Sequence, residues 1–229
     1  MFRKITSQEE EKNIFWVSYT DFMLSLTAIF IVLMSFFLYQ YQSVQAGKEK
    51  STQKQSIEKQ QQEGYKELKE EFENIIQENP QIDAKVSDEG TVRFYSTRDK
   101  VLFPDNSDQI TPYFEQQLNI FLPEFLMIAI NKKDKIKEIR IEGHASKKGD
   151  YLYNLDLSNR RANKVLSYML TIMQEKYESQ FISYIQKHTL SCGFSYSKML
   201  DAYGRNTEDE YLADEEKCRR VEFRVLLKN

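Results

Sequence analysis

The sequence predicts an α+β protein in which a single N-terminal transmembrane helix is followed by a tether and then by an α/β sandwich domain. The mean hydropathy of −0.62 is typical of a water-soluble chain, yet the apolar residues are concentrated near the N-terminus. From residue 81 onward, segments of alternating polarity take turns with segments of helical periodicity. The predicted parts are a cytoplasmic tail at 1–13, the transmembrane helix at 14–39, a linker with an amphipathic helix at 40–80, and the domain at 81–229.

The membrane segment runs from Ile14 to Tyr39 and reads IFWVSYTDFMLSLTAIFIVLMSFFLY, with Asp21 as its one formal charge. About 20 apolar residues are enough to cross a bilayer as a helix. A secretory signal peptide is the competing interpretation, but its apolar core is shorter and ends at a cleavage site of small residues. Because this run is longer and ends in Phe-Phe-Leu-Tyr, we expect an uncleaved transmembrane helix.

Asp21 is the candidate ion-carrying residue of this helix. A carboxylate inside a bilayer costs about 2.5–3.5 kcal/mol on insertion scales, so such residues usually face a protein interior or a water-filled path. Low-dielectric surroundings favour the neutral form of a carboxyl group, which can then take up a proton and release it in a wetter environment. The alternative is an aspartate that reaches interfacial water, but Asp21 lies roughly 10 Å into the span at 1.5 Å per residue.

The segment after the membrane helix changes composition twice. Residues 40–64 are rich in Gln, Lys, Glu and Ser, which indicates a solvated tether or a frayed helix. Residues 65–79 carry apolar side chains at helical spacing, and Pro80 ends the pattern. We expect this amphipathic helix either to pack on the following domain or to pair with its copy in a dimer.

The remaining sequence predicts a small mixed sheet with helices on one face. Its last strand places Val221, Phe223, Val225 and Leu227 on one side. The other predicted elements are a hairpin at 84–88 and 91–96, strands at 136–142 and 190–196, and helices at 111–131, 155–176 and 178–188.

Composition and motifs argue against several functions. A net charge of −3 gives no general attraction to nucleic acid. The two histidines and two cysteines lack the spacing of a zinc site, so no metal is expected. The sequence has no G-x-S-x-G motif and no phosphate loop, so we expect neither an enzyme nor a cofactor. Cys192 and Cys218 are either a disulfide or two separate thiols, and sequence alone leaves both alternatives open.

Three segments carry a family resemblance: VLFPDNSDQITP at 101–112, IRIEGHASKKGDYLYNLDLSNRRANKV at 139–165, and RRVEFRV at 219–225. In this order and spacing they resemble the OmpA-like peptidoglycan-binding domain. The middle segment matches the family at Gly143, His144, Asn154, Leu157, Ser158, Arg161 and Ala162. The resemblance implies an OmpA-like α/β sandwich that binds peptidoglycan.

The resemblance also implies a binding role for Arg161, because the matching arginine of the family binds the diaminopimelate of the stem peptide. A guanidinium can grip a carboxylate with two hydrogen bonds. An aspartate of the family accepts from the ligand's ammonium, but this chain has Ser146 at that position, which carries no charge. Asp150 would replace it if the loop folded back.

The remaining candidates of this region have structural alternatives. Asn154 and Ser158 are candidate peptidoglycan-binding residues, but either side chain is also suited to capping or stabilising the start of a helix. The alternative for the arginine is a surface residue paired with Asp156 or Glu222.

The N-terminal segment adds a second resemblance. Trp16 followed by Ser-Tyr-Thr-Asp-Phe-Met at 18–23 is similar to the W-x-x-(S/A)-Y-x-D-x-M entry of MotB-type stator subunits, in which the matching Asp carries the ion. The stretches GDYLYNLDLS and RRVEFR resemble the ZorB subunits of Zorya anti-phage systems more than flagellar MotB. This resemblance implies a homodimer, a MotA- or ZorA-like multi-span membrane partner, and a proton-conducting stator held by peptidoglycan. The alternatives are a flagellar stator and a static membrane-to-wall anchor.

The expected location is the bacterial inner membrane, crossed once, with the N-terminus in the cytoplasm and the C-terminal domain in the periplasm. This orientation depends mainly on the resemblance of the domain. Basic residues lie on both sides of the span, with Arg3, Lys4 and Lys12 before it and Lys48 and Lys50 after it. The positive-inside rule therefore gives only a weak bias.

Overall fold

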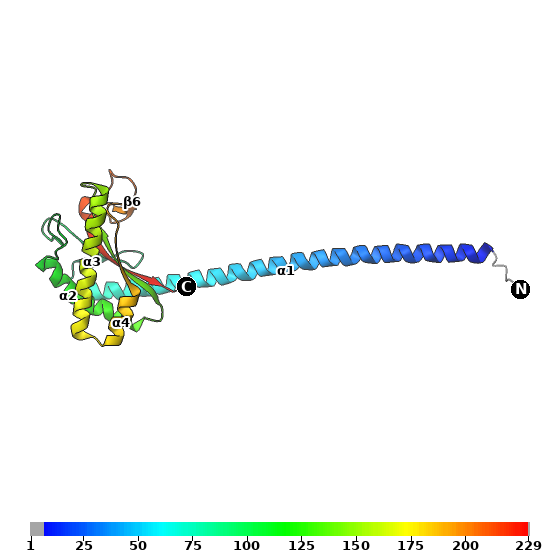
Figure 1. Cartoon of the computed structure of the whole chain (residues 1–229), viewed down its shortest axis with the longest axis horizontal. Helices are drawn as coiled ribbons and strands as arrows, with labels where there is room; N and C mark the ends of the chain where they lie inside the picture. The colour runs from blue at the N-terminus through cyan, green and yellow to red at the C-terminus, as the bar shows by residue number, and fades with distance from the viewer. Residues whose placement is uncertain (1–6, 229) are drawn as a thin grey trace. The chain divides into compact units, whose positions relative to one another are not determined.

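The computed structural model describes residues 7–228 (Figure 1). The chain divides into two compact units, Met1–Glu58 and Lys59–Asn229, whose boundary lies within one long helix. Residues 1–6 of the predicted tail lie outside the described residues.

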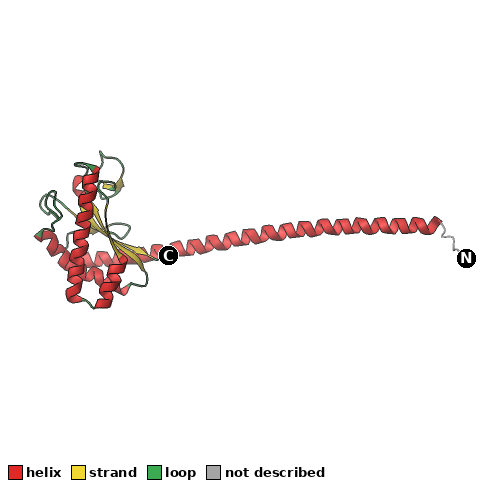
Figure 2. Cartoon of the chain, in the orientation of Figure 1, coloured by secondary structure: helices red, strands yellow, loops and turns green. Residues whose placement is uncertain are grey.

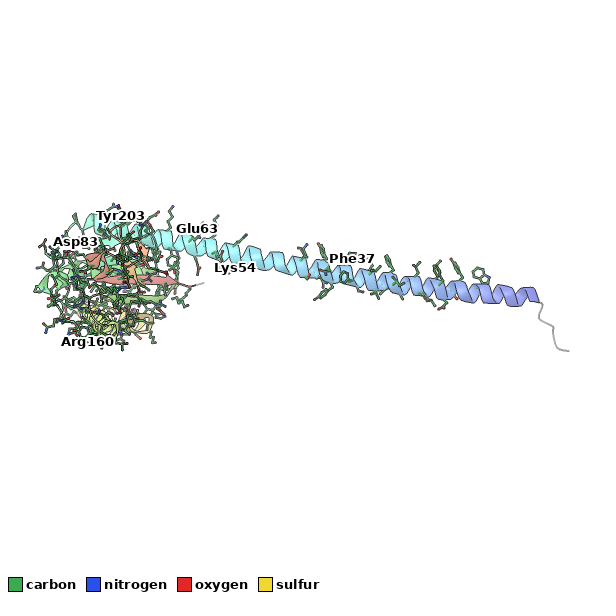
Figure 3. All side chains as sticks on the ribbon, turned by 90° about the horizontal axis from the view of Figure 1, so that it is seen from above. Phe37, Lys54, Glu63, Asp83, Arg160 and Tyr203 are labelled. Atoms are coloured by element: carbon green, nitrogen blue, oxygen red, sulfur yellow. The ribbon has the colours of Figure 1, made fainter. Side chains whose placement is uncertain are left out.

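Helix α1 covers Ser7–Glu78 and thereby replaces the predicted tether. Of the two alternatives for residues 40–64, the structure shows the helical one, because Gln, Lys, Glu and Ala are good helix formers. Lys54 and Glu58 also form an i,i+4 ion pair at 3.8 Å on this helix, labelled at Lys54 in Figure 3. The predicted domain boundary at residue 81 moves to Lys59, because the end of α1 packs into the second unit.

The first unit contains one segment that is long and apolar enough to cross a membrane. It covers Tyr19–Gln45, with a mean hydropathy of 2.3, and overlaps the predicted span at 14–39. The side chains are exposed at every position of this segment, including Phe37, which Figure 3 labels. Exposure of so many large apolar groups is what a bilayer, rather than water, accommodates.

The second unit is built on a five-stranded sheet with the order β1-β2-β7-β3-β4 (Figure 2). The neighbours are antiparallel except for the parallel pair β3 and β4. The predicted hairpin is confirmed as β1 and β2, which pair Ala84 with Phe94. The strands are β1 at Ala84–Val86, β2 at Val92–Tyr95, β3 at Ile136–His144, β4 at Thr189–Gly193 and β7 at Arg220–Leu227.

Helices cover one face of this sheet and enclose the core (Figures 1 and 2). They are α2 at Pro112–Asn131, α3 at Tyr151–Lys176 and α4 at Ser179–His188, together with the end of α1. Phenylalanines from the sheet and α2 form the centre, where the rings of Phe94 and Phe121 lie 5.2 Å apart and those of Phe121 and Phe223 lie 5.1 Å apart. Such aromatic pairs contribute about 0.5–1.5 kcal/mol beyond the area they bury.

The C-terminal end of α1 belongs to this core, so the predicted packing of residues 65–79 on the domain is confirmed. Leu68 and Phe72 are buried, and the Phe72 ring stacks on Phe125 with centroids 5.6 Å apart. At the edge of the contact, Lys132 Nζ pairs with Glu67 at 2.7 Å and with Glu71 at 3.1 Å.

The segment between β4 and β7 holds elements that the sequence analysis missed. Strands β5 at Met199–Leu200 and β6 at Asn206–Thr207 form a small separate ladder, and α5 covers Glu215–Cys218. These elements are too short to show periodicity.

Cys192 and Cys218 are free thiols, so the disulfide alternative fails. Cys192 on β4 lies opposite Glu142 on the neighbouring strand β3, and Glu142 lies opposite Glu222 on β7, on the other side of β3. Two strand spacings of about 4.8 Å separate these positions, and Cys218 lies a further four residues before Glu222 along the chain. The two Cα atoms are therefore beyond the bridging range of about 7 Å.

Candidate functional site

A cleft of about 520 Å³ lies where β3 ends and β7 begins, beside the first turns of α3. It is lined by residues from all three segments that carry the family resemblance. The lining comprises Ser96, Thr97, Arg98, Val101, Leu102, Phe103, Asp105, Asn106, Gly143, His144, Ala145, Ser146, Lys148, Asn154, Leu157, Arg161, Arg219 and Arg220. Segments distant in sequence thus meet at one end of the sheet.

Two glycines allow α3 to reach this position. A Cβ atom at Gly143 would overlap the Ser158 carbonyl, and one at Gly193 would overlap Ser158 and the Asn159 backbone. Strands β3 and β4 therefore accept the helix only because they carry no side chain there. The close approach places the first turns of α3, and Asn154 and Arg161 with them, at the cleft.

Arg161 lies in the wall of the cleft and does not form either of the pairs considered from the sequence. Its Nε donates to the Ser107 carbonyl at 2.8 Å, its Nη2 donates to the Pro104 carbonyl at 3.1 Å, and its guanidinium lies 5.1 Å from the Phe103 ring centroid. Among the side chains that the structure describes, no carboxylate forms an ion pair with it. Two backbone bonds leave N–H groups of the planar fork to hold a ligand carboxylate.

Burial lowers the pKa of the Arg161 guanidinium from its ordinary value, against the opposing effect of the nearby Asp105 and Asp108 carboxylates. The first of these acids also lines the cleft. A partly desolvated cation attracts an anionic ligand more strongly than one in bulk water does.

Ser146 and Asn154 also line the cleft, as predicted from their positions in the sequence. Both are buried. The Asn154 Nδ2 donates to the Lys148 carbonyl at 2.8 Å and fastens the loop between β3 and α3. Asn154 is therefore at least a positioning residue, and its role toward a ligand stays a prediction.

Asp150 and Ser158 form hydrogen bonds that hold the chain's own backbone, in contrast to the binding roles considered for them. Asp150 is the N-cap of α3 and accepts from the Leu152 and Tyr153 N–H groups at 2.9 and 3.1 Å. Ser158 is buried, donates to the Leu155 carbonyl and accepts from the Ser195 N–H. Neither residue lines the cleft, so the loop does not bring Asp150 to the place of a ligand-binding acid.

Charged residues that the sequence analysis did not select also line the cleft. They are Arg98, Asp105, Lys148, Arg219 and Arg220. No motif marks them, since their relevance follows from loops that meet in space. The basic pair Arg219 and Arg220, at the start of β7, was the available signal, because it belongs to the third segment of the resemblance.

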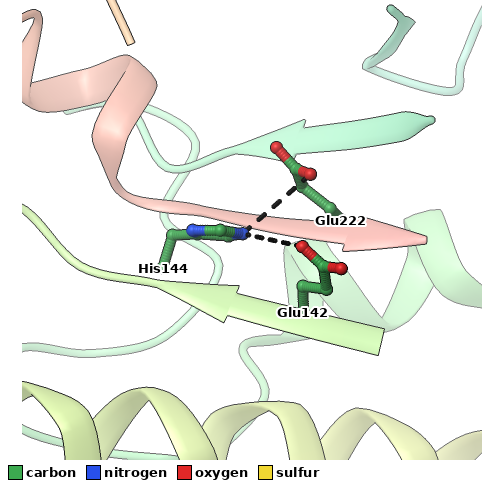
Figure 4. A group of neighbouring side chains, drawn as sticks. All are labelled: Glu142, His144 and Glu222. Atoms are coloured by element: carbon green, nitrogen blue, oxygen red, sulfur yellow. Dashed lines mark ion pairs between the residues drawn. The ribbon is translucent and has the colours of Figure 1, made fainter. Parts of the chain in front are cut away.

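A buried group of charges lies beside the cleft, on the face of the sheet opposite the core helices α2 and α3. Glu142, His144 and Glu222 bring their ligand-type atoms within 4.8 Å of one another (Figure 4). The His144 Nε2 lies 3.7 Å from Glu142 and 3.9 Å from Glu222, and its ring stacks on Phe194 with centroids 5.3 Å apart.

The carboxylates of this group already have cationic partners. Glu222 contacts Arg93 at 2.9 Å and Arg220 at 2.6 Å, while Glu142 contacts Lys198 at 3.2 Å and Arg224 at 3.4 Å. A divalent ion would have to enter among four positive charges, so the group fits a metal poorly.

These ion pairs set the protonation states of the buried group. Burial by itself raises the pKa of Glu222, but the positive charge of Arg220 and of the other nearby cations lowers it to about 2. Burial, together with the nearby Arg220, lowers the pKa of His144 to about 4, against the effect of Glu142. At neutral pH the glutamate is therefore charged and the histidine neutral.

Asp21 lies in the first unit, on the apolar segment Tyr19–Gln45, and its side chain is exposed. It is the only charged residue of that segment. Its assignment as the ion-carrying group still comes from the sequence.

Comparison with known proteins identifies the domain. Residues 102–183 match the OmpA family. The chain is 28% identical to the Zorya protein ZorB of Escherichia coli, over 96% of this chain and 90% of the relative.

Two solved structures are similar to part of this chain. One is a putative MotB-like protein from Desulfovibrio vulgaris, with 22% identity and a TM-score of 0.45 over 76% of this chain and 97% of the other. Another is the cell wall anchor of the T6SS from Pseudomonas aeruginosa, with 15% identity and a TM-score of 0.44 over 68% and 96% of the two chains. Residues 102–183 therefore form an OmpA-family domain, and the chain as a whole is similar to ZorB.

Proposed function

We propose that this chain is an ion-conducting subunit of a rotary stator and that its second unit anchors it to peptidoglycan. The observation that carries the proposal is the combination, in one chain, of a single apolar span with one carboxylate and an OmpA-family domain with an arginine-lined cleft. A span that only tethers a domain has no need of a charged residue that is costly to insert.

In this function the cleft holds the stem peptides of peptidoglycan, and Arg161 binds one of their carboxylates. The guanidinium is held by the Pro104 and Ser107 carbonyls, so its orientation is fixed before the ligand arrives. A group that is ordered in advance loses less entropy on binding. Attachment to the wall keeps the subunit stationary while its partner moves.

Ion flow takes place at Asp21, next to a partner. One helix cannot enclose a water-filled path, so two copies of this helix are surrounded by copies of a MotA- or ZorA-like multi-span subunit. Protons bind to the carboxylate and leave it as the partner turns. The chain crosses the inner membrane once, with its N-terminus in the cytoplasm and its second unit in the periplasm.

The biological role that we propose is anti-phage defence, which is supported by the similarity to ZorB along almost the whole chain. The test is Asp21→Asn in the native chromosome, with the neighbouring genes intact. Asn keeps the size of the side chain but cannot carry a proton. We expect the plaquing efficiency of phage to rise in the mutant at an unchanged protein level.

Asp21→Glu is the matched control, because it keeps a titratable carboxyl group and should retain part of the protection. Unchanged plaquing in Asp21→Asn would remove the defence role, and the swimming of the same strain would then separate a flagellar stator from a static anchor. Conduction by the purified chain in liposomes without a partner would contradict the proposed assembly.

A further inference from the structure

We propose that Ser25 is a positioning residue of the ion site: its hydroxyl pairs with the Asp21 carboxyl group and holds it on one face of the apolar segment Tyr19–Gln45. This inference rests on the proposed function, in which Asp21 carries the proton. It adds a second polar group of this chain to the site, about one helical turn further toward the C-terminal end of the segment.

The serine and threonine hydroxyls of the apolar segment follow one pattern, with a single exception. Four of the five donate to a backbone carbonyl three or four residues earlier on the same helix, and they are Thr20, Thr27, Ser35 and Ser43. Such a bond satisfies a hydroxyl within a helix. Ser25 is the fifth, and its hydroxyl has no hydrogen bond to any residue that the structure describes. It is therefore available to another group.

The group within reach of this hydroxyl is the carboxyl group of Asp21, four residues earlier on the continuous helix α1. Side chains four residues apart lie on the same side of a helix, with Cβ atoms about 5–6 Å apart. One hydrogen bond between a serine hydroxyl and an aspartate carboxyl group spans that separation. Because Asp21 is the only charged residue of the segment, no other charge on it competes for the contact.

The two residues lie on the side of the helix that carries the smaller side chains. At about 100° per residue, Ser25 lies about 40° from Asp21 around the helix axis. The residues of the same sector between Ser25 and Tyr39 are Ala28, Val32 and Ser35. The opposite side carries Met23, Leu26, Phe30 and Phe37. Small residues are typical of the side on which transmembrane helices approach one another closely, so we infer that Asp21 and Ser25 face protein rather than lipid.

A hydroxyl can satisfy a carboxyl group in both of its protonation states. When Asp21 has released its proton, the Ser25 O–H donates to the carboxylate, and when Asp21 is protonated, the carboxyl O–H donates to the Ser25 Oγ. The carried proton passes between Asp21 and the water or partner group opposite it, and Ser25 keeps its own. The hydrogen bond to the charged form is the stronger of the two, so the hydroxyl favours release of the proton.

The test measures the reaction of Asp21 with dicyclohexylcarbodiimide, which modifies protonated carboxyl groups in apolar surroundings. Membranes from cells with the neighbouring genes intact are treated at a series of pH values, and mass spectrometry gives the modified fraction of Asp21. In Ser25→Ala we expect the midpoint of this reaction to move about one pH unit upward, because the hydrogen bond to the charged form is lost. Ser25→Thr keeps a hydroxyl and should restore the midpoint of the original chain.

Thr27→Ala is the matched control, because the Thr27 hydroxyl donates to the Leu24 carbonyl and lies about 120° from Asp21 around the axis. It should leave the midpoint in place. An unchanged midpoint in Ser25→Ala, an equal shift in Thr27→Ala, or a shift that Ser25→Thr does not reverse would overturn the inference and leave the proposed function standing. Absence of any reaction at Asp21 in the original chain would instead overturn the proposed function, and this inference with it.

Discussion

Two charged regions meet where β3 ends and β7 begins, and they differ in how their charges are compensated. In the buried group each glutamate lies within 4 Å of at least two cations, as Glu222 does with Arg93 and Arg220. In the cleft, Arg161 has only backbone carbonyls as hydrogen-bond partners, and Arg98 has no ion pair with a described residue. The charges of the buried group are paired within the chain, whereas the cationic cleft is complementary to a negatively charged ligand. Charge alone therefore does not indicate a binding site, whereas charge without a protein partner beside a cleft does.

The largest expected effect comes from breaking the buried group. Glu222→Gln leaves Arg93 and Arg220 buried without their carboxylate, which should lower the unfolding free energy of the second unit by roughly 3–5 kcal/mol. Urea unfolding of the full chain in detergent, followed by near-ultraviolet circular dichroism, measures this change.

Asp156→Asn is the control, because Asp156 and Arg160 form an exposed pair that should contribute less than about 1 kcal/mol. If Glu222→Gln costs no more than this control, the buried pairs are not a stabilising unit.

The buried group also predicts how stability depends on pH. The folded-state pKa of His144 is about 4, below its ordinary 6.5, so the unfolded chain binds more protons between these values. The pKa of Glu222 is lowered from 4.5 to about 2, which acts in the same direction at lower pH. Stability should therefore be greatest above pH 6.5 and fall on acidification, by at most about 1.4 kcal/mol per pH unit for each group.

His144→Gln removes the titrating ring and should flatten the part of this profile between pH 6.5 and about 4. A profile that keeps its slope in the variant would show that another group is responsible. Urea unfolding at a series of pH values gives the comparison.

In the cleft, Arg161→Lys should weaken the binding of isolated peptidoglycan by about ten- to a hundredfold, because lysine keeps the charge but loses the planar fork. A sedimentation assay with purified sacculi measures the loss. Stability should change less than in Glu222→Gln, since the charge of Arg161 is not compensated by a buried carboxylate. Unchanged binding would show that Arg161 only braces the loop that carries Pro104 and Ser107.

The smallest effect is expected at the exposed rim of the cleft. Arg98→Gln should weaken binding a few-fold at low salt, and the difference should vanish near 1 M salt, where the Debye length is about 3 Å. Lys85→Gln on the same unit, outside the cleft lining, is a control of equal charge change. A loss that persists at high salt would indicate a direct, desolvated contact instead.

The sequence predicted the elements whose signals are local. The apolar run was sufficient for the membrane span, and the alternation in β7 predicted the buried positions Val221 and Phe223. It did not predict that Arg220 and Glu222, on the opposite side of the strand, would also be buried. Their burial depends on partners from β2, β3 and the insertion around Lys198, which no period in β7 reports.

The sequence by itself determined the apolar helix, the position of Asp21 within it, the order of the longer helices and strands after residue 81, and Arg161 as a ligand-binding candidate, because composition, periodicity and motif spacing are local properties. It did not determine β5, β6 and α5, which are too short to show a period. The tertiary structure alone decided that Asp150 caps a helix, that the thiols are too far apart to join, and that Asp105 rather than Asp150 lines the cleft. Each of these outcomes depends on which loops meet in space. Strand order and close helix packing at Gly143 and Gly193 determine that meeting, and neither can be read from neighbouring residues.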